Sequence, residues 1–411
     1  MVSSQSDPYV GLSFDDQFRI VEPIGEGTMA RVYRARQLGV ERDVAIKILK
    51  RELTALPDVL ARFRREAELV ARLAHPHVVV VHGIGRVPVF GPDVGGEPYT
   101  ALEYLEGPSL GLLLEREGGI LPLGRALHIV LGLCDAIGTA HACGVVHRDL
   151  KPENVLLVRR GDDVDFVKVL DFGLAKAQNS AVDVQTRAGA VLGTPRYVSP
   201  EGAQGDEVGP AGDCYALATL LYQCLVGRTP FDGSDPLTLL VAQVSSTPPE
   251  IGSHAAAAAI PQPLSRVIMQ NLSKRPSDRA PDARALGRAL VEASRRAHLG
   301  SDEIGLSSTL LGTERTRRVN SAPPVHRVEP STSREPSMAL EPARASVEPS
   351  SSLSAGAAPV SDAQNRARRR RARRVRHAAI FAVCFLLGIV AALAIASSLG
   401  VFEPGSSGVA P

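Results

Sequence analysis

The octapeptide His147-Arg148-Asp149-Leu150-Lys151-Pro152-Glu153-Asn154 carries a base, two cations and an amide within eight residues. Seventeen residues after Asn154 the chain reads Asp171-Phe172-Gly173. A carboxylate at 171 and an amide at 154 suit a divalent cation that bridges phosphate oxygens. Asp149 suits a hydroxyl nucleophile that must be oriented and lose its proton. Lys151 suits the negative charge that develops on a transferring phosphoryl group.

These two stretches resemble the catalytic and metal-binding loops of eukaryotic-like (Hanks-type) bacterial serine/threonine protein kinases. The resemblance extends over roughly residues 18 to 295, since companion motifs follow in order. It implies an α+β fold with two lobes, a mainly antiparallel sheet with one helix and a mainly helical second lobe. It also implies that Asp149, Lys151 and Asn154 are catalytic, and that Asn154 and Asp171 bind Mg²⁺, with Mn²⁺ as an alternative.

A glycine-rich turn, Gly25-Glu26-Gly27-Thr28-Met29-Ala30, separates two alternating apolar stretches. Two strands joined by such a turn bring backbone N–H groups close to an anion, because glycine has no Cβ to clash. An ordinary hairpin is the alternative reading of the turn taken by itself. It resembles the phosphate-covering loop of kinases, except that Ala30 replaces the third glycine.

Lys47 lies inside an apolar run, residues 44–49, that we expect to be a strand. An unpaired buried ammonium is costly, so this lysine requires a partner. Residues 58–74 show the periodicity of an amphipathic helix that carries Glu66. The resemblance pairs Glu66 with Lys47, which then holds the α and β phosphates of ATP. A solvated helix charge is the alternative for Glu66.

Residues 99–105 are expected to form the strand that leads into the adenine-binding connection, with Leu102 in the position that controls access to the pocket. The resemblance assigns nucleotide contacts to Ile24, Gly25, Glu26, Gly27, Val32, Ala45, Lys47, Glu66, Glu103, Leu105 and Leu156. His75, His77 and His82 are not expected to bind metal, because no carboxylate or cysteine completes a ligand set. A strand is expected to open at Val78, and residues 85–98 are expected to be a loop.

The second lobe is expected to begin at Gly107. A long apolar helix over 125–143 ends before Gly144, and a β-hairpin of residues 155–157 and 167–170 leads to Asp171. Further helices are expected over 213–226 and 281–298. The resemblance implies that Asp213 fixes the backbone of the catalytic loop and that Arg279 pairs with Glu201.

Residues 171–201 resemble an activation segment ending in Ser-Pro-Glu where the family has Ala-Pro-Glu. Arg148 before the catalytic aspartate is typical of kinases that are switched on by phosphate in this segment. A phosphate adds about two negative charges that can pair with arginine. Thr186 is the first expected phosphorylation site, followed by Ser180 and Thr194. Thr194 and Lys151 indicate Ser/Thr rather than Tyr specificity.

The chain has 411 residues, with 46 Lys plus Arg against 44 Asp plus Glu. Eight of the arginines lie between 366 and 376, and without them the balance is 38 − 44 = −6. A nucleic-acid partner is therefore not expected. The five cysteines form no CxxC pair, so we expect buried free thiols and neither zinc site nor disulfide framework.

The composition predicts six regions along the chain. These are a flexible leader (1–17), the kinase domain (18–298), a disordered Ser/Pro/Glu-rich linker (299–365), a basic juxtamembrane segment (366–377), a transmembrane helix (378–402) and a short extracytoplasmic tail (403–411). The 25 uncharged residues 378–402 would extend about 37 Å as a helix, enough to cross a bilayer. The arginines before them place the kinase domain in the cytoplasm.

We therefore expect a single-pass membrane kinase that uses ATP, phosphorylates Ser and Thr of proteins and activates itself, with homodimerisation as a route to trans-phosphorylation. Two alternatives remain. A pseudokinase scaffold is disfavoured because each chemistry-bearing motif position is filled. A small-molecule phosphotransferase of kinase-like fold is disfavoured by the activation segment and the run from Gly193 to Glu201.

Overall fold

The computed structural model describes residues 7–88, 96–172 and 195–300. The chain divides into two units, Met1–Asn320 and Ser321–Pro411, and all described residues belong to the first. Most of the predicted linker, the juxtamembrane segment, the transmembrane helix and the tail lie outside the described residues, as do Thr186, Ser180 and Thr194.

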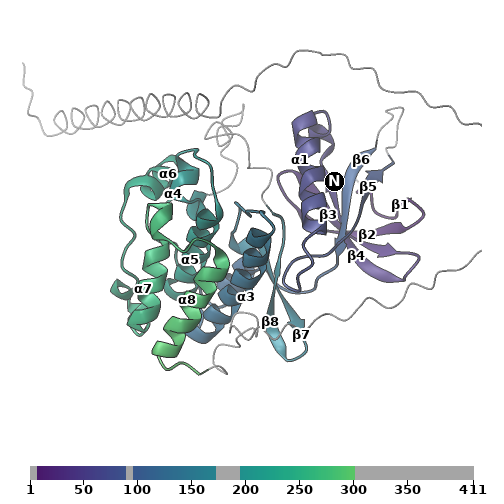
Figure 1. The fold of residues 1–411 in the computed structure, drawn as a ribbon. Helices are drawn as coiled ribbons and strands as arrows, with labels where there is room; N and C mark the ends of the chain where they lie inside the picture. Colours follow the sequence, from purple (N-terminus) through teal and green to yellow (C-terminus); the bar gives the residue numbers. More distant parts are fainter. Residues whose placement is uncertain (1–6, 89–95, 173–194, 301–411) are drawn as a thin grey trace, which may run out of the picture. The chain divides into compact units, whose positions relative to one another are not determined.

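Six strands of the described residues form one antiparallel sheet in the order β1-β2-β3-β4-β6-β5. Their bounds are β1 Ser13–Phe14, β2 Phe18–Glu26, β3 Ala30–Gln37, β4 Arg42–Leu49, β5 Val81–Val87 and β6 Glu97–Glu103. Helix α1, Pro57–Ala71, contacts β5 and β6 and lies beside the sheet in Figure 1. This is the sheet lobe that the resemblance implied.

The sheet buries a different apolar cluster on each face, because successive side chains of a strand point to opposite sides. On one face Tyr33, Val44 and Ile46 pack into a cluster completed by residues that precede β2. On the other, Ala30 packs with Leu49 and with Phe63 of α1. The methyl group that replaces the third loop glycine thus lies in the core, where it stabilises the base of the turn.

The second lobe is helical, apart from an antiparallel hairpin formed by β7 Val155–Arg160 and β8 Asp163–Val169. Its helices are α2 Leu110–Arg116, α3 Leu123–Ala142, α4 Pro200–Ala203, α5 Pro210–Val226, α6 Pro236–Ser245, α7 Gln262–Asn271 and α8 Ala283–Arg296. Helix α3 packs against α5, α8 and β8, and Figure 1 shows it between the hairpin and the other helices. The two lobes predicted from the sequence, one a mainly antiparallel sheet with one helix and the other mainly helical, are confirmed.

Helix α3 also has the length and apolarity of a membrane span. Among the described residues it is the one helix that meets this test, and 72% of its most apolar window is buried. Burial against neighbouring helices explains its apolar composition as that of a core helix.

Gly107, in the connection between the lobes, lies very close to the backbone of β7. A Cβ built on this glycine would lie 1.9 Å from the carbonyl oxygen of Leu157 on β7. No side chain fits in that gap, which explains why the residue predicted to open the second lobe is a glycine.

Four local predictions differ from the structure. Residues 7–17, expected within a flexible leader, pack on the sheet and form β1. Strand β5 begins at Val81 rather than Val78, because Val78 bridges to Val169 and the Val79 N–H donates to the Val169 carbonyl at 3.1 Å. Residues 85–87 and 97–98, expected in a loop, belong to β5 and β6. Cys143, expected buried, is exposed at the end of α3.

Candidate active site

The backbone of the catalytic loop is fixed by one buried carboxylate. Asp213, in the first turn of α5, accepts the His147 N–H at 2.7 Å and the Arg148 N–H at 2.9 Å. His141 of α3 lies 2.9 Å from the same carboxylate. Arg148 has a left-handed φ of +66°, which a non-glycine residue rarely adopts, so these bonds hold a strained backbone. The contact of Asp213 with this loop matches its predicted position.

Asp149, Lys151 and Asn154 are brought together on this loop. Lys151 Nζ lies 3.0 Å from Asp149 Oδ2. The Asn154 side-chain amide donates to the Asp149 carbonyl at 2.8 Å and to Oδ2 at 3.3 Å. These bonds fix the rotamer of the carboxylate and use the nitrogen of the Asn154 amide, so its oxygen is the atom suited to a cation.

His147 joins the catalytic loop to the segment that carries Asp171. Its Nε2 lies 3.2 Å from the Leu170 carbonyl, and its Nδ1 lies 3.3 Å from the Asp149 backbone nitrogen. A carbonyl only accepts and an N–H only donates, so Nε2 carries the proton and Nδ1 does not. Burial lowers the pKa of His147, in agreement with a neutral ring.

Asp171 follows the hairpin, and its two neighbours in the chain, Leu170 and Phe172, are held by the catalytic loop. The Leu170 N–H donates to the Asn154 carbonyl at 2.9 Å, and the Phe172 ring, fully buried, lies 4.7 Å from the His147 ring. Asp171 itself has a φ of +30°. The two predicted metal ligands are therefore attached to each other through one backbone hydrogen bond.

Lys47 on β4 lies between two carboxylates. Its Nζ is 2.6 Å from Asp171 Oδ1 and 3.4 Å from Glu66 Oε1 of α1. Burial alone would lower the pKa of Lys47, but Asp171 and Glu66 outweigh burial and raise it above its usual value. Burial, together with repulsion from the Asp171 carboxylate, raises the pKa of Glu66 to about 7 despite the attraction of Lys47. The predicted Lys47–Glu66 pair is present, with Asp171 as an additional partner.

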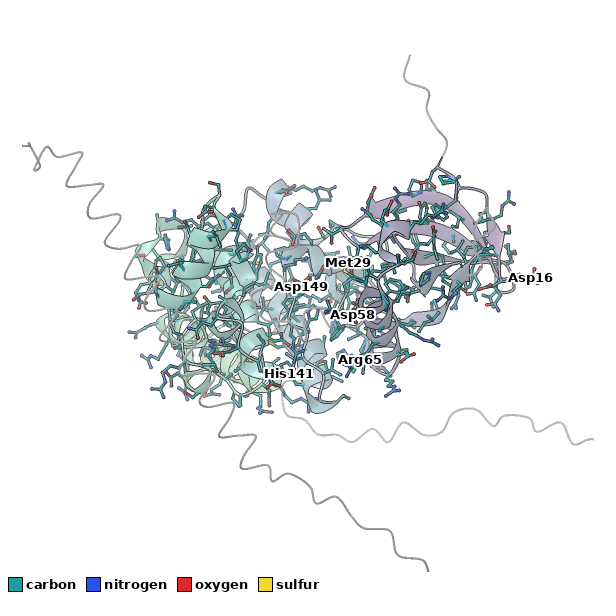
Figure 2. The ribbon with its side chains drawn as sticks, turned by 90° about the horizontal axis from the view of Figure 1, so that it is seen from above. Asp16, Met29, Asp58, Arg65, His141 and Asp149 are labelled. Atoms are coloured by element: carbon teal, nitrogen blue, oxygen red, sulfur yellow. The ribbon has the colours of Figure 1, made fainter. Side chains whose placement is uncertain are left out.

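The glycine-rich turn joins β2 to β3. The Gly27 N–H donates to the Ala30 carbonyl at 2.9 Å, which closes the turn. The Glu26 side chain is more than half exposed and pairs with Lys50 at 2.7 Å and with Arg31 at 3.6 Å. The part of Glu26 available to a phosphate is thus its backbone. Figure 2 shows Met29 of this turn at the end of the sheet lobe that lies toward Asp149.

The predicted adenine-side residues come from both lobes. Val32 pairs with Lys47 across β3 and β4, and Ala45 pairs with Leu102 across β4 and β6. Leu156 lies on β7, and Ile24 is 45% exposed on β2. Leu105 lies beyond the end of β6 at Glu103. The strand register places Val32, Ala45 and Leu102 on one face of the sheet.

Glu103 makes contacts that the sequence reasoning missed. Its carboxylate lies 2.5 Å from Lys168 Nζ of β8 and accepts the Val80 N–H at 2.8 Å. Its own N–H donates to the Val80 carbonyl at 2.9 Å. Lys168 follows the same logic as Lys47, a lone lysine in an apolar strand that requires a partner, so the signal was present.

The donor set fits a divalent cation held partly by phosphate. Within the described residues no cluster of three or more His, Cys, Asp or Glu side chains could hold a metal alone. Asp171, whose side chain is 47% exposed, and Asn154 offer two oxygen ligands. Mg²⁺ in nucleotide enzymes is bound in this way, through one or two protein oxygens together with phosphate and water. His75 and His77 contact Asp135 and the Val167 carbonyl instead.

The sequence profile of the protein kinase domain matches residues 18–289. The chain is 39% identical over 287 residues to the serine/threonine-protein kinase pkn3 of Myxococcus xanthus, with 69% of this chain and 51% of that protein covered. It is 35% identical over 308 residues to the serine/threonine-protein kinase PknB of Mycobacterium tuberculosis, with 75% and 47% covered. The chain therefore spans about half the length of these curated relatives.

The fold is also similar to a solved structure, the PknI kinase domain of Mycobacterium tuberculosis. The TM-score is 0.53 at 27% sequence identity, with 69% of this chain and 98% of that one covered. The family requires ATP and a divalent metal ion. The profile match over residues 18–289 and the named relatives show that the chain belongs to the protein kinase domain family, among relatives that are bacterial serine/threonine kinases.

Proposed function

We propose that the chain is an active serine/threonine protein kinase that transfers the γ-phosphate of ATP to hydroxyl groups of protein substrates. The observation that carries this proposal is the joint position of Asp149, Lys151 and Asn154 on a loop fixed by Asp213. A scaffold that only binds nucleotide has no need of this catalytic geometry, because it transfers no phosphate.

Asp149 orients the substrate hydroxyl and accepts its proton as the oxygen attacks the γ-phosphorus. Its carboxylate is held by Asn154 and Lys151, so its position is set before the substrate arrives. Lys151 also supplies a positive charge where the phosphoryl group carries negative charge in transfer. Positioning and charge stabilisation account for most of the catalysis in this enzyme class.

Lys47 binds the α and β phosphates, and Glu66 holds the lysine in place. In the structure Asp171 occupies part of this lysine's coordination at 2.6 Å. A phosphate at Lys47 and a cation at Asp171 would replace that contact with two stronger partners. Backbone N–H groups of the turn from Gly25 to Ala30 cover the phosphates, with Ile24, Val32, Ala45 and Leu156 against the base.

Asp171 and Asn154 would hold Mg²⁺, with Mn²⁺ as an alternative ion. When bound, this metal neutralises charge on the β and γ phosphates. The contribution of the chain is to hold the two oxygen ligands together through the Leu170 N–H bond to the Asn154 carbonyl. Neutral His147 hydrogen-bonds to the Leu170 carbonyl and to the Asp149 N–H, so it connects both loops without adding charge.

Location and control follow from sequence alone. We propose that residues 378–402 anchor the kinase in the cell membrane, with the catalytic domain in the cytoplasm, on the basis of 25 uncharged residues after an arginine-rich segment. We further propose that two copies phosphorylate each other at Thr186. An effect of Thr186→Ala on activity would support this, and unchanged activity would contradict it.

The function is tested by incubating the full chain with ATP and Mg²⁺ and mapping phosphate by intact and peptide mass. The matched control is Asp149→Asn, which keeps the shape of the side chain but cannot accept the proton. We expect phosphate on Ser or Thr of the wild type only, at a rate roughly 10²- to 10⁴-fold above the variant. Nucleotide binding should be equal in both.

Two outcomes would overturn the assignment. Equal phosphate transfer by Asp149→Asn would remove its catalytic role. Transfer to small alcohols but to no Ser or Thr of any protein, including the chain itself, would indicate a small-molecule phosphotransferase.

A further inference from the structure

Residues 7–17 form an ordered segment that we call the N-terminal strap. It precedes residue 18, where the match to the protein kinase domain begins. Ser13 and Phe14 pair with β2, the Gly11 N–H donates to the Ile20 carbonyl at 2.9 Å, and the Ile20 N–H donates to the Leu12 carbonyl at 2.9 Å. The strap is therefore a fixed part of the sheet lobe.

The turn between the strap and β2 is fastened at the end of the sheet far from the glycine-rich turn. Asp15 and Asp16 have left-handed φ values of +52° and +51°. The Asp15 carboxylate accepts the Tyr99 hydroxyl at 2.5 Å, which holds this strained turn against β6. Figure 2 shows Asp16 at one end of the lobe and Met29 at the other.

The opposite end of the strap is fastened beside the glycine-rich hairpin. Asp7 Oδ2 accepts the hydroxyl of Tyr33 on β3 at 3.0 Å. The ring of Tyr9 lies 5.4 Å from the ring of Tyr33, and the Tyr9 hydroxyl donates to Glu97 of β6. The side chain of Tyr33, buried and hydrogen-bonded, thus connects the hairpin to the strap.

Tyr33 lies where the hairpin is least supported by its own sheet. Strand β2 changes register between Ile20 and Glu22 and again between Pro23 and Gly25. Tyr33 is the partner of Pro23, and only the pairs Gly25–Val32 and Glu26–Arg31 follow before the turn. A register shift breaks the ladder and Pro23 has no N–H to donate, so the hairpin can bend at this point.

The strap and the nucleotide-binding residues lie on opposite faces of the hairpin. Val32 and Lys47 alternate along the strands with Tyr33 and Ile46, which belong to the cluster covered by the strap. A hollow of about 550 Å³ separates the strap from the hairpin, lined by Asp7 and Pro8 on one side and by Pro23, Gly25, Glu26, Arg31 and Tyr33 on the other. The Asp7–Tyr33 bond connects the two sides of this hollow, beside the contact between the rings of Tyr9 and Tyr33.

We infer that Asp7 and Tyr33 are positioning residues for ATP: through their hydrogen bond, the N-terminal strap prevents the glycine-rich hairpin from bending away from the nucleotide. The inference rests on the proposed kinase function. It makes residues outside the family's common domain part of the machinery that sets nucleotide affinity in this chain.

The test measures KM for ATP, kcat, and KM for a fixed Ser/Thr acceptor in full-length Tyr33→Phe, which removes one hydroxyl and keeps the ring. We expect KM for ATP to rise about three- to tenfold, which corresponds to the loss of about one hydrogen bond. The kcat and the KM for the acceptor should stay the same. Asp7→Ala should raise KM for ATP at least as much, because it also removes the bond that the Asp7 carboxylate accepts from the Tyr9 N–H at 3.0 Å. The double variant should be no worse than Asp7→Ala alone, because that single variant already removes the Asp7–Tyr33 contact.

The matched control is Tyr222→Phe, which removes a buried hydroxyl on α5 that contacts the Pro249 carbonyl and His254. It should lower stability without changing KM for ATP. If Tyr33→Phe and Asp7→Ala raise KM for ATP no more than Tyr222→Phe does, the inference is wrong. A parallel increase in both substrates' KM would also overturn it, because that would indicate general loosening.

Failure of this inference can be told apart from failure of the proposed function. The dissociation constant of a fluorescent ATP analogue is measured for the same variants without any acceptor. A wild type that binds the analogue but transfers no phosphate would refute the kinase assignment, and the strap would still be judged by the change in dissociation constant.

Discussion

Lys168 Nζ lies 2.5 Å from Glu103 Oε1, and this pair joins the end of β6 to the hairpin that carries Asp171. Lys168 Nζ also lies 3.4 Å from the Val78 carbonyl, so this ammonium connects β8 to two other segments. The residue expected to present its backbone to adenine is thereby held from the second lobe. The contact between the end of β6 and β8 at this point is thus a polar one.

Replacement of Lys168 by Met tests this link. Both side chains are mostly buried, with 11% and 22% exposed, so breaking the pair leaves a carboxylate with only the Val80 N–H. We expect the free energy of unfolding to fall by about 3 kcal/mol. Denaturant unfolding measures the loss. The double variant Lys168→Met with Glu103→Gln should recover part of it, and a double variant less stable than the single one would contradict the explanation.

Glu66 predicts an unusual dependence of stability on pH. Burial, followed by repulsion from Asp171, raises its pKa from 4.5 to about 7 despite the attraction of Lys47. Between these values the folded chain binds more protons than the unfolded chain. The stabilising contribution of Glu66 is therefore complete below 4.5 and is lost as the pH rises through about 7.

The measurement is the free energy of unfolding of wild type minus that of Glu66→Gln, from pH 5 to 8, without nucleotide or divalent cation. We expect this difference to decrease as the pH rises. A difference that stays level or increases would show that Glu66 is ionised throughout.

Asp213→Asn should uncouple the catalytic loop from α5. The His147 and Arg148 N–H groups donate to different oxygens of the carboxylate, and an amide has an NH₂ group in place of one of them, so one bond is lost. We expect unfolding to require about 2 kcal/mol less, and kcat to fall more than KM for ATP rises. Asp235→Asn at the exposed start of α6 is the control, since asparagine caps helices as well as aspartate. Equal effects of the two variants would exclude a special role for Asp213.

The Glu201–Arg279 pair predicts a stability effect remote from ATP. Arg279 donates to both Glu201 oxygens, at 2.9 and 2.8 Å, and its side chain is fully buried. Glu201→Gln leaves that guanidinium charge without a carboxylate and should cost about 3 to 5 kcal/mol. Glu292→Gln, which breaks the exposed pair with Arg296, should cost under about 1 kcal/mol. Thermal unfolding compares them, and a small effect of Glu201→Gln would mean that the pair is dispensable.

Sequence reasoning predicted those parts of the site that short motifs determine. Lys47 in an apolar strand, the catalytic loop and the hairpin before Asp171 are local patterns, and resemblance supplied the distant pairs of Asp213 and Arg279. The Glu103–Lys168 pair was missed because its residues lie 65 positions apart and share no motif. Only the docking of the hairpin on β6 brings them together.

The N-terminal strap was missed for a different reason. Residues 1–17 are polar on average, which favours a flexible leader, yet Tyr9 and Phe14 supply apolar area and Asp7 and Asp15 bind buried tyrosine hydroxyls. The average polarity of this segment does not reveal that single residues in it make buried contacts. The predicted start of a strand at Val78 was wrong because the backbone of Val78 pairs with Val169 in the other lobe. Local sequence propensity does not encode such a long-range contact.

The close approach of Gly107 to β7, where a Cβ would lie 1.9 Å from the Leu157 carbonyl oxygen, limits how the two lobes can be exchanged between kinases. A chimera that takes its sheet lobe from one parent and its helical lobe from another brings together a connector and a β7 strand that never shared a selection history. The carbonyl oxygen of Leu157 lies where a side chain at position 107 would begin. The crossover point therefore belongs before Gly107, so that the connector and β7 come from the same parent.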